Sequence, residues 1–262
     1  MTFSTETIIA LGIGGLLAIA IPAAAIIIYK VKNKETWLPA VFIGAGTFFV
    51  FALILEQLLH AVMLPVIGDS VAGYVIYGAL AAGIFEETGR FVAYKTLMRK
   101  HYTTKNSIMM GLGHGGFEAM ILIGTMMLSY LVLAITVNSV GMDEVLNSVG
   151  NDEALIEAAK TQIEAISGFG FINVGLTIFE RLIAMTVHVC FSVWVYKAVS
   201  VKGKLWLFPA AALAHAVIDI AAALYQKGVW DILPVYIYMA VGTAIVVVIT
   251  VIMAKKLPDK SK

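Results

Sequence analysis

Long apolar segments separated by short polar ones run through the whole chain. A run of about 20 mainly apolar residues is long enough to cross the hydrocarbon core of a bilayer as a helix. Seven segments approach or exceed this length, and they lie at about 7–30, 37–62, 71–98, 106–137, 169–197, 204–226 and 231–254. The pattern predicts an all-α fold, a polytopic transmembrane helix bundle of about seven spans.

The composition agrees with an integral membrane protein. Hydrophobic residues make up 60% of the 262 residues and charged residues only 13%, whereas soluble domains carry about 25% charged residues. The formal net charge of +1 gives no basic surplus for nucleic acid, and a single cysteine, Cys190, excludes an internal disulfide. We expect a multi-pass protein of the cell membrane, of the bacterial plasma membrane type, in contact with the lipid bilayer and without a nucleic-acid partner.

Basic residues are distributed unequally between the two ends of the predicted spans. The C-terminal tail and the regions 30–34, 95–105 and 197–204 together hold 14 of the 18 Lys and Arg residues. The loops on the opposite side hold only Lys160 and Lys227. Because cytoplasmic loops are enriched in Lys and Arg, this distribution predicts an N-out, C-in topology.

The chain contains no polar stretch long enough for a soluble domain, so residues 1–262 are predicted to form a single integral membrane domain. Its longest polar stretch, 138–168, is predicted to be an extracytoplasmic loop. Apolar residues recur at helical spacing within 152–166, between acidic ones. This spacing predicts an amphipathic helix at the outer surface, either a lid or a simple connector.

Three histidines fall at one predicted depth on three different spans. His114, His188 and His215 each lie roughly 8–10 residues from the cytoplasmic end of their segment, or about 12–15 Å along a helix. Ionisable groups inside a bilayer cost several kcal/mol unless they are paired or ligated. Because zinc takes imidazole nitrogens, the three histidines are predicted to bind one divalent metal, Zn²⁺ or another.

Two adjacent acids, Glu86 and Glu87, lie on the third span, with Arg90 one turn further on. Either carboxylate is within reach of the guanidinium on a helix. We expect one glutamate to pair with Arg90 and the other to face the metal site. A purely structural Glu–Arg pair is the alternative, but it leaves the second acid unexplained.

Two of the histidines are followed four residues later by an acid, in the pairs His114–Glu118 and His215–Asp219. Residues four apart share a helix face. Each acid could therefore bind the metal directly or orient its histidine from behind. The alternative for each pair taken alone is a satisfied buried hydrogen bond.

Four further polar residues lie in the outer halves of their spans. Glu180-Arg181 precedes His188 on the fifth span, and Glu56 and His60 lie on the second. Arg181 is interpreted as a counter-charge for an acid within the membrane or as an anchor for a substrate carbonyl. Glu56 is expected to balance Arg181, and His60 falls too near the outer interface to join the site.

Together these motifs resemble those of a known family. They are Glu-Glu-Thr-Gly-Arg at 86–90, Gly-His-Gly-Gly-x-Glu at 113–118, Glu-Arg at 180–181 followed by a histidine, and His-Ala-x-x-Asp at 215–219. The set resembles the YhfC-like membrane metalloproteases, relatives of the PrsW proteases. More broadly it is similar to the CAAX-protease and bacteriocin-processing (ABI) superfamily. The resemblance covers most of the chain.

The resemblance implies a helical intramembrane fold, a divalent metal and hydrolysis of a peptide bond in a membrane-associated substrate. It implies that Glu86 activates water, with Glu87 and Arg90 as supporting pair. His114 and His215 match the histidines of the family motifs, while the role of His188 depends mainly on its depth. Asp219 stands where CAAX proteases have asparagine, and those proteases usually place the arginine one residue further from the glutamates.

The sequence therefore predicts an intramembrane zinc metalloprotease with Glu86 as general base. Three alternatives stay open at this point. Buried acids and histidines also build the relays of transporters and proton-coupled channels, although the chain lacks the repeated halves usual in transporters. The others are a non-catalytic membrane chaperone on the same fold and an enzyme acting on lipid or prenyl substrates.

Overall fold

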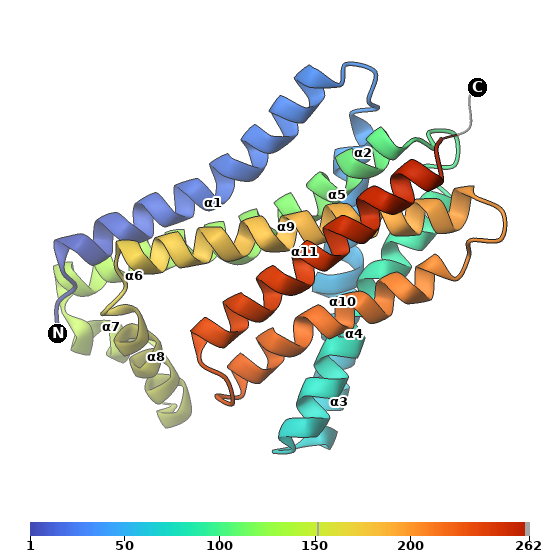
Figure 1. Ribbon diagram of the computed structural model, residues 1–262. Coiled ribbons are helices and arrows are strands. Elements are labelled where there is room, and N and C mark those ends of the chain that lie inside the picture. Colours follow the sequence, from blue (N-terminus) through green and yellow to red (C-terminus); the bar gives the residue numbers. More distant parts are fainter. Residues whose placement is uncertain (151, 260–262) are drawn as a thin grey trace. The chain divides into compact units, whose positions relative to one another are not determined.

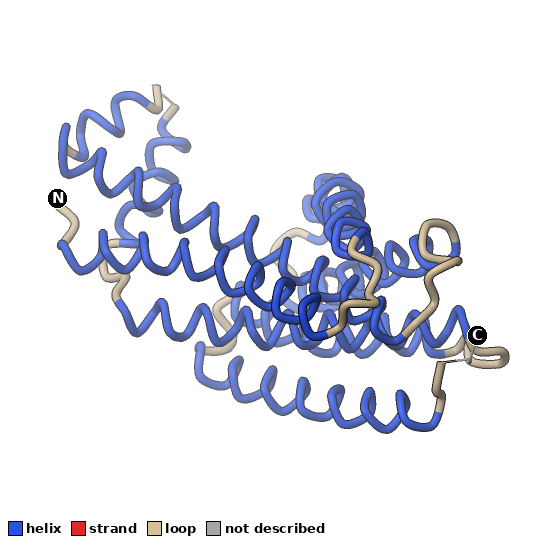
Figure 2. The backbone as a smooth tube through the Cα atoms, turned by 90° about the horizontal axis from the view of Figure 1, so that it is seen from above, coloured by secondary structure: helices blue, strands red, loops and turns tan. Residues whose placement is uncertain are grey.

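The computed structural model describes residues 1–150 and 152–259, and this part of the chain contains helices joined by loops and no strand (Figures 1 and 2). The all-α prediction is confirmed. The elements are α1 (Thr5–Lys32), α2 (Pro39–Thr47), η1 (Phe48–Glu56), α3 (Gln57–Ile67), α4 (Val71–Lys95), α5 (Thr104–Glu118), η2 (Ala119–Gly124), α6 (Thr125–Val140), α7 (Met142–Ser148), α8 (Glu153–Ile166), α9 (Phe171–Ser200), α10 (Leu207–Gln226) and α11 (Ile232–Lys256).

Six helical stretches in the described chain are long and apolar enough to cross a membrane, which confirms a multi-pass integral protein. They are Thr5–Lys32, Pro39–Ile67, Thr104–Val140, Phe171–Ser200, Leu207–Gln226 and Ile232–Lys256. The seventh predicted span forms α4, whose 25 residues are also long enough. Its charged residues Glu86, Glu87 and Arg90 make it less apolar than the others. We propose that α4 crosses as well; the N-out, C-in topology stays a prediction.

Two of the long helices contain a π-helical segment. The first, η1, begins directly after Thr47, and the second, η2, directly after Glu118. Both of these preceding residues have buried side chains. Since π segments shift the helix face and are frequent at functional sites, these two positions are candidates for a site.

By their internal contacts the residues form two compact units. Unit 1 comprises Met1–Ala23 and Ala119–Arg181, and unit 2 comprises Ala24–Glu118 and Leu182–Lys262. Unit 1 contains α8, which covers the amphipathic helix expected at 152–166. Its N-cap, Asp152, accepts two backbone hydrogen bonds. Its apolar edge joins a small core, made of Phe3, Leu11, Ala134, Val137, Ile163 and Ile166.

In unit 2, glycines allow the helices to approach closely. A Cβ atom added to Gly44 would lie 2.0 Å from the backbone oxygen of Met110. One added to Gly83 would lie 2.3 Å from the oxygen of Ala212, and one added to Gly111 would lie 2.5 Å from the Cα of Val189. Such distances are too short for any side chain, so α2 packs directly on α5, α4 on α10 and α5 on α9. Small residues at helix contacts are typical of membrane bundles.

The segment after α11 is attached to unit 2 through Asp259. Its carboxylate accepts hydrogen bonds from the backbone and hydroxyl of Thr104 at 2.7 Å each, from the Tyr196 hydroxyl at 2.8 Å and from Lys197 Nζ at 2.7 Å. Partial burial opposes ionisation of this carboxyl group. The hydrogen bonds from Lys197, Thr104 and Tyr196 outweigh it and lower the pKa of Asp259 to about 2.

Candidate metal centre

A cluster of ionisable side chains forms where four helices of unit 2 meet. We call it the polar cluster, and its members are Glu86, Glu87 and Arg90 of α4, His114 and Glu118 of α5, His188 of α9, and His215 and Asp219 of α10. All are buried except Asp219, whose side chain is 30% exposed. The glycine contacts of α4 with α10 and of α5 with α9 bring these helices together.

One carboxylate oxygen, Oε2 of Glu86, lies among the three histidines. It is 2.8 Å from Nε2 of His114, 3.6 Å from Nδ1 of His188 and 4.0 Å from Nε2 of His215. Arg90 is 3.5 Å away on the same helix. The histidines predicted to lie at one depth are therefore neighbours, and Glu86 is at their centre.

Glu87 has different partners from Glu86. Its Oε1 atom forms an ion pair with Arg90 and lies 2.8 Å from Nδ1 of His215. Glu87, Arg90 and His114 are completely buried. Of the two adjacent acids of α4, Glu87 thus forms the direct arginine pair and Glu86 lies among the histidines; their roles at a metal site stay predictions.

The hydrogen bonds of His114 determine which of its ring nitrogens is protonated. Its Nδ1 is 3.1 Å from the Thr47 hydroxyl, which itself donates to the Gly44 carbonyl at 2.7 Å. Because the hydroxyl proton is used, Nδ1 of His114 must donate to Thr47. The Nε2 lone pair then faces the Glu86 carboxylate, so two acceptors meet at 2.8 Å unless a proton or a metal ion lies between them.

His215 is oriented in a similar way. Its Nδ1 donates to the Glu87 carboxylate, which leaves Nε2 as an acceptor facing Asp219 at 3.4 Å and Glu86 at 4.0 Å. A carboxylate behind one ring nitrogen, with the other nitrogen directed forward, is the usual arrangement of a metal-binding histidine.

His188 has the opposite polarity. Arg90 donates to its Nδ1 at 2.7 Å, so the proton of the neutral ring is on Nε2, which lies 2.5 Å from Oε2 of Glu118. His188 is therefore not held as a ready metal ligand in this arrangement. It would bind a metal through Nε2 only after losing that proton, for which Glu118 is the nearest acceptor.

Two sets of three ligand atoms lie within 4.8 Å of one another in the described chain. The first is Glu86, His188 and His215, and the second is His114, Glu118 and His188. Neither set contains all three histidines. The predicted trio is therefore divided between two overlapping sets that share His188.

The charges of the polar cluster suit a bound cation. The cluster contains four carboxylates and a single guanidinium: Glu86 and Glu87 contact Arg90, whereas Glu118 contacts His188 and Asp219 contacts His215. Unbalanced charge is costly inside a membrane protein. Moreover, the buried Oε2 of Glu87 has no hydrogen-bond partner within the described chain. Neutral imidazoles with carboxylates are also a donor set that zinc accepts, so the residues fit a divalent metal.

Three neighbours of the histidines were not predicted from the sequence. Thr47 orients His114, Phe48 lies edge-on to the same ring at 5.3 Å, and Phe191 stacks on His215 at 5.2 Å between centroids. They pack against the rings and limit their movement. No motif distinguishes them from other residues of apolar helices, although Phe191 lies one turn from His188.

The other predicted supporting residues have partners of their own. Glu56 is buried and lies 3.3 Å from Nε2 of His60, whose Nδ1 is 2.7 Å from the Tyr77 hydroxyl. Glu180 and Arg181 belong to unit 1 and pair with each other. The proposed roles of Arg181 as counter-charge and of Glu56 as support remain predictions.

Comparison with known proteins identifies relatives over most of the chain. Residues 17–247 match the model of a family described as YhfC intramembrane metalloprotease. The uncharacterized membrane protein YhfC of Bacillus subtilis (strain 168) is 33% identical over 232 residues, which cover 86% of this chain and 88% of the relative. No solved structure gives a significant match.

Proposed function

The chain belongs to the YhfC intramembrane metalloprotease family, and on this basis we propose that it hydrolyses a peptide bond in a membrane-embedded or membrane-associated protein or peptide. The main support is the position of Glu86, whose carboxylate lies within 4.0 Å of a ring nitrogen of three buried histidines from three helices. A metal-dependent hydrolase needs a set of metal ligands and a general base next to them.

We propose Zn²⁺ as the metal. His114 and His215 would hold it through Nε2, since the other nitrogen of each ring is already bonded to an orienting acceptor. Because the two rings fall in different ligand sets, they would have to move closer together when the metal binds. His188 would be the third ligand after passing its Nε2 proton to Glu118. A divalent cation held there would acidify a bound water and polarise the carbonyl of the substrate.

Glu86 is the proposed general base. Its Oε2 atom takes a proton from the attacking water, whose oxygen bonds to the carbonyl carbon. As the C–N bond breaks, Glu86 returns the proton to the leaving amine. Glu87 and Arg90 do not exchange protons in this scheme. Arg90 neutralises Glu87, and Glu87 keeps His215 in the tautomer that leaves Nε2 as acceptor.

The test is cleavage of membrane-spanning peptides that carry a fluorophore and a quencher, reconstituted with the purified protein in lipid vesicles. Loss of a general base lowers the rate by about 10²–10⁴-fold, so Glu86→Gln should abolish measurable cleavage. Glu35→Gln is the control, because it changes an exposed glutamate of unit 2 that pairs with Lys105 and is not a member of the polar cluster. Equal cleavage by wild type and Glu86→Gln would contradict the proposal.

A further inference from the structure

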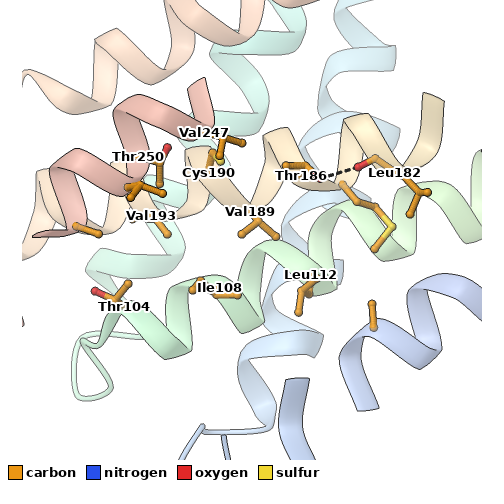
Figure 3. Close-up of a pocket in the computed structure, with 14 residues that line it drawn as sticks. Thr104, Ile108, Leu112, Leu182, Thr186, Val189, Cys190, Val193, Val247 and Thr250 are labelled. Carbon is orange, nitrogen blue, oxygen red and sulfur yellow. Dashed lines mark hydrogen bonds between the residues drawn. The ribbon is translucent and has the colours of Figure 1, made fainter. Parts of the chain in front are cut away.

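Unit 2 contains a second feature, an apolar groove whose lining residues, drawn in Figure 3, include no member of the polar cluster. Its volume is about 450 Å³. Residues of α5, α9 and α11 line it, among them Ile108, Leu112, Val189 and Val247, and α1 contributes Ala25. We call it the lateral groove.

The lateral groove offers no free hydroxyl to a polar ligand. Of its three threonines, Thr104 donates to Asp259, Thr186 to the Leu182 carbonyl and Thr250 to the Val246 carbonyl, each at 2.7 Å. The bond of Thr186 is drawn in Figure 3. With these groups satisfied, the groove suits a hydrocarbon chain.

The length of the groove matches one leaflet of a bilayer. Along α9 its lining runs from Leu182 to Val193, about 16 Å of helix, and along α5 from Thr104 to Leu112, about 12 Å. Half of a hydrocarbon core is about 15 Å. A transmembrane helix would need a groove about twice as long, so a single acyl chain is the better match.

One end of the groove carries unpaired positive charge. Ala254 lines that end and is followed by Lys255 and Lys256 in the last turn of α11, both exposed. Neither lysine has an acidic partner in the described chain. Phosphates of anionic lipids are attracted to lysines at this position, just outside a span.

From these observations we propose that the lateral groove binds one anionic phospholipid of the surrounding leaflet. An acyl chain fills the groove, and the phosphate lies on Lys255 and Lys256. The site is separate from the polar cluster and does not depend on proteolysis. The lipid would cover the apolar surface between α9 and α11. His188 belongs to α9, and His114 belongs to α5, which also lines the groove.

Trp194 lies next to the groove, because its Nε1 donates a hydrogen bond at 2.7 Å to Thr250, which lines the groove. The fluorescence of Trp194 can therefore report on a lipid bound there. A variant with the other three tryptophans (Trp37, Trp206 and Trp230) changed to Phe is placed in phosphatidylcholine vesicles. Brominated-chain phosphatidylglycerol is then compared with brominated phosphatidylcholine as quencher. Two lysines attract the phosphate of the anionic lipid. We therefore expect brominated phosphatidylglycerol to reach half-maximal quenching at a mole fraction on the order of tenfold lower than brominated phosphatidylcholine does.

Two pairs of variants separate the headgroup from the acyl chain. Lys255→Gln with Lys256→Gln should remove the preference, whereas Lys100→Gln with Lys202→Gln, which changes two other exposed lysines, should keep it. Thr186→Phe should fill the groove and reduce quenching by both lipids. Ile245→Phe, at an exposed position of α11 outside the groove, should not.

Native mass spectrometry of the wild-type protein is the second measurement and needs no tryptophan changes. We expect one phosphatidylglycerol to stay bound per chain and to be lost in the Lys255→Gln, Lys256→Gln variant. Equal quenching by the two lipids, quenching that is unchanged by Thr186→Phe, or a spectrum without bound anionic lipid would each overturn the proposal.

Discussion

Two groups of side chains in unit 2 contain a histidine and a glutamate in contact, and they differ in charge balance. The first, the polar cluster, contains four carboxylates and one guanidinium, and Nε2 of His114 and of His215 is directed at carboxylates. In the second, both ring nitrogens of His60 have partners, Glu56 at 3.3 Å and Tyr77 at 2.7 Å. The second group contains a single acid, whereas the first has a surplus of acids.

A spacing of four residues between histidine and acid therefore does not by itself identify a metal site. His114–Glu118, His215–Asp219 and Glu56–His60 all have that spacing. What distinguishes the polar cluster is that several helices bring unbalanced negative charge and acceptor nitrogens to one place. A metal ion is expected there and not at His60.

The largest effect on stability is expected when a charge of the polar cluster loses its partner. Arg90→Ala leaves Glu87 buried without its guanidinium, and Glu87→Gln leaves Arg90 without its closest carboxylate. Each should lower the free energy of unfolding by about 3–5 kcal/mol. His60→Phe, in the less charged group, should cost only about 1 kcal/mol. Thermal unfolding of the purified variants in one detergent measures the difference; equal losses would contradict it.

A smaller effect is expected at Thr47. Thr47→Val removes the acceptor of His114 Nδ1 and should weaken zinc binding by about 10–100-fold, as loss of an orienting partner usually does. Thr47→Ser keeps the hydroxyl and should restore the affinity. Thr243→Val is the control, since this buried hydroxyl has no hydrogen-bond partner in the described chain. Competition against a fluorescent zinc chelator gives the affinities, and unchanged binding in Thr47→Val would show that His114 does not need Thr47.

The smallest effect is expected outside both groups, at Asp259. Because its pKa is lowered to about 2 from the ordinary value of 3.8, the folded state is stabilised by the ionised carboxyl above about pH 4. That contribution should be lost as the pH falls from about 4 to 2. The group is partly exposed, so Asp259→Asn should cost only about 1 kcal/mol at neutral pH. Unfolding curves of both proteins should converge near pH 2; a constant difference between them would contradict this assignment.

The apolar pattern predicted the helices well, because long runs such as 231–254 can be buried in lipid only as helices. It predicted α4 less directly. The residues that make α4 less apolar than its neighbours, Glu86, Glu87 and Arg90, are also those that form the polar cluster. A span that carries buried charge is thus harder to recognise by hydropathy and more informative about function.

The depth of His114, His188 and His215 along their helices predicted that they would be neighbours. It could not predict the direction of their hydrogen bonds. The proton on His188 depends on Arg90, and that on His114 depends on Thr47, which lies one residue before a π segment. The Thr47–His114 contact requires the close approach of α2 and α5 at Gly44, which sequence spacing does not specify.

The most direct test of a metal centre in the polar cluster is the metal content of the purified protein, measured by inductively coupled plasma mass spectrometry. We expect one zinc or other divalent ion per chain in the wild type and in His60→Ala. The variant with both His114→Ala and His215→Ala should remain a folded membrane protein and contain none. Equal metal content in all three proteins, or loss of metal in His60→Ala alone, would contradict the assignment of the polar cluster as the metal centre.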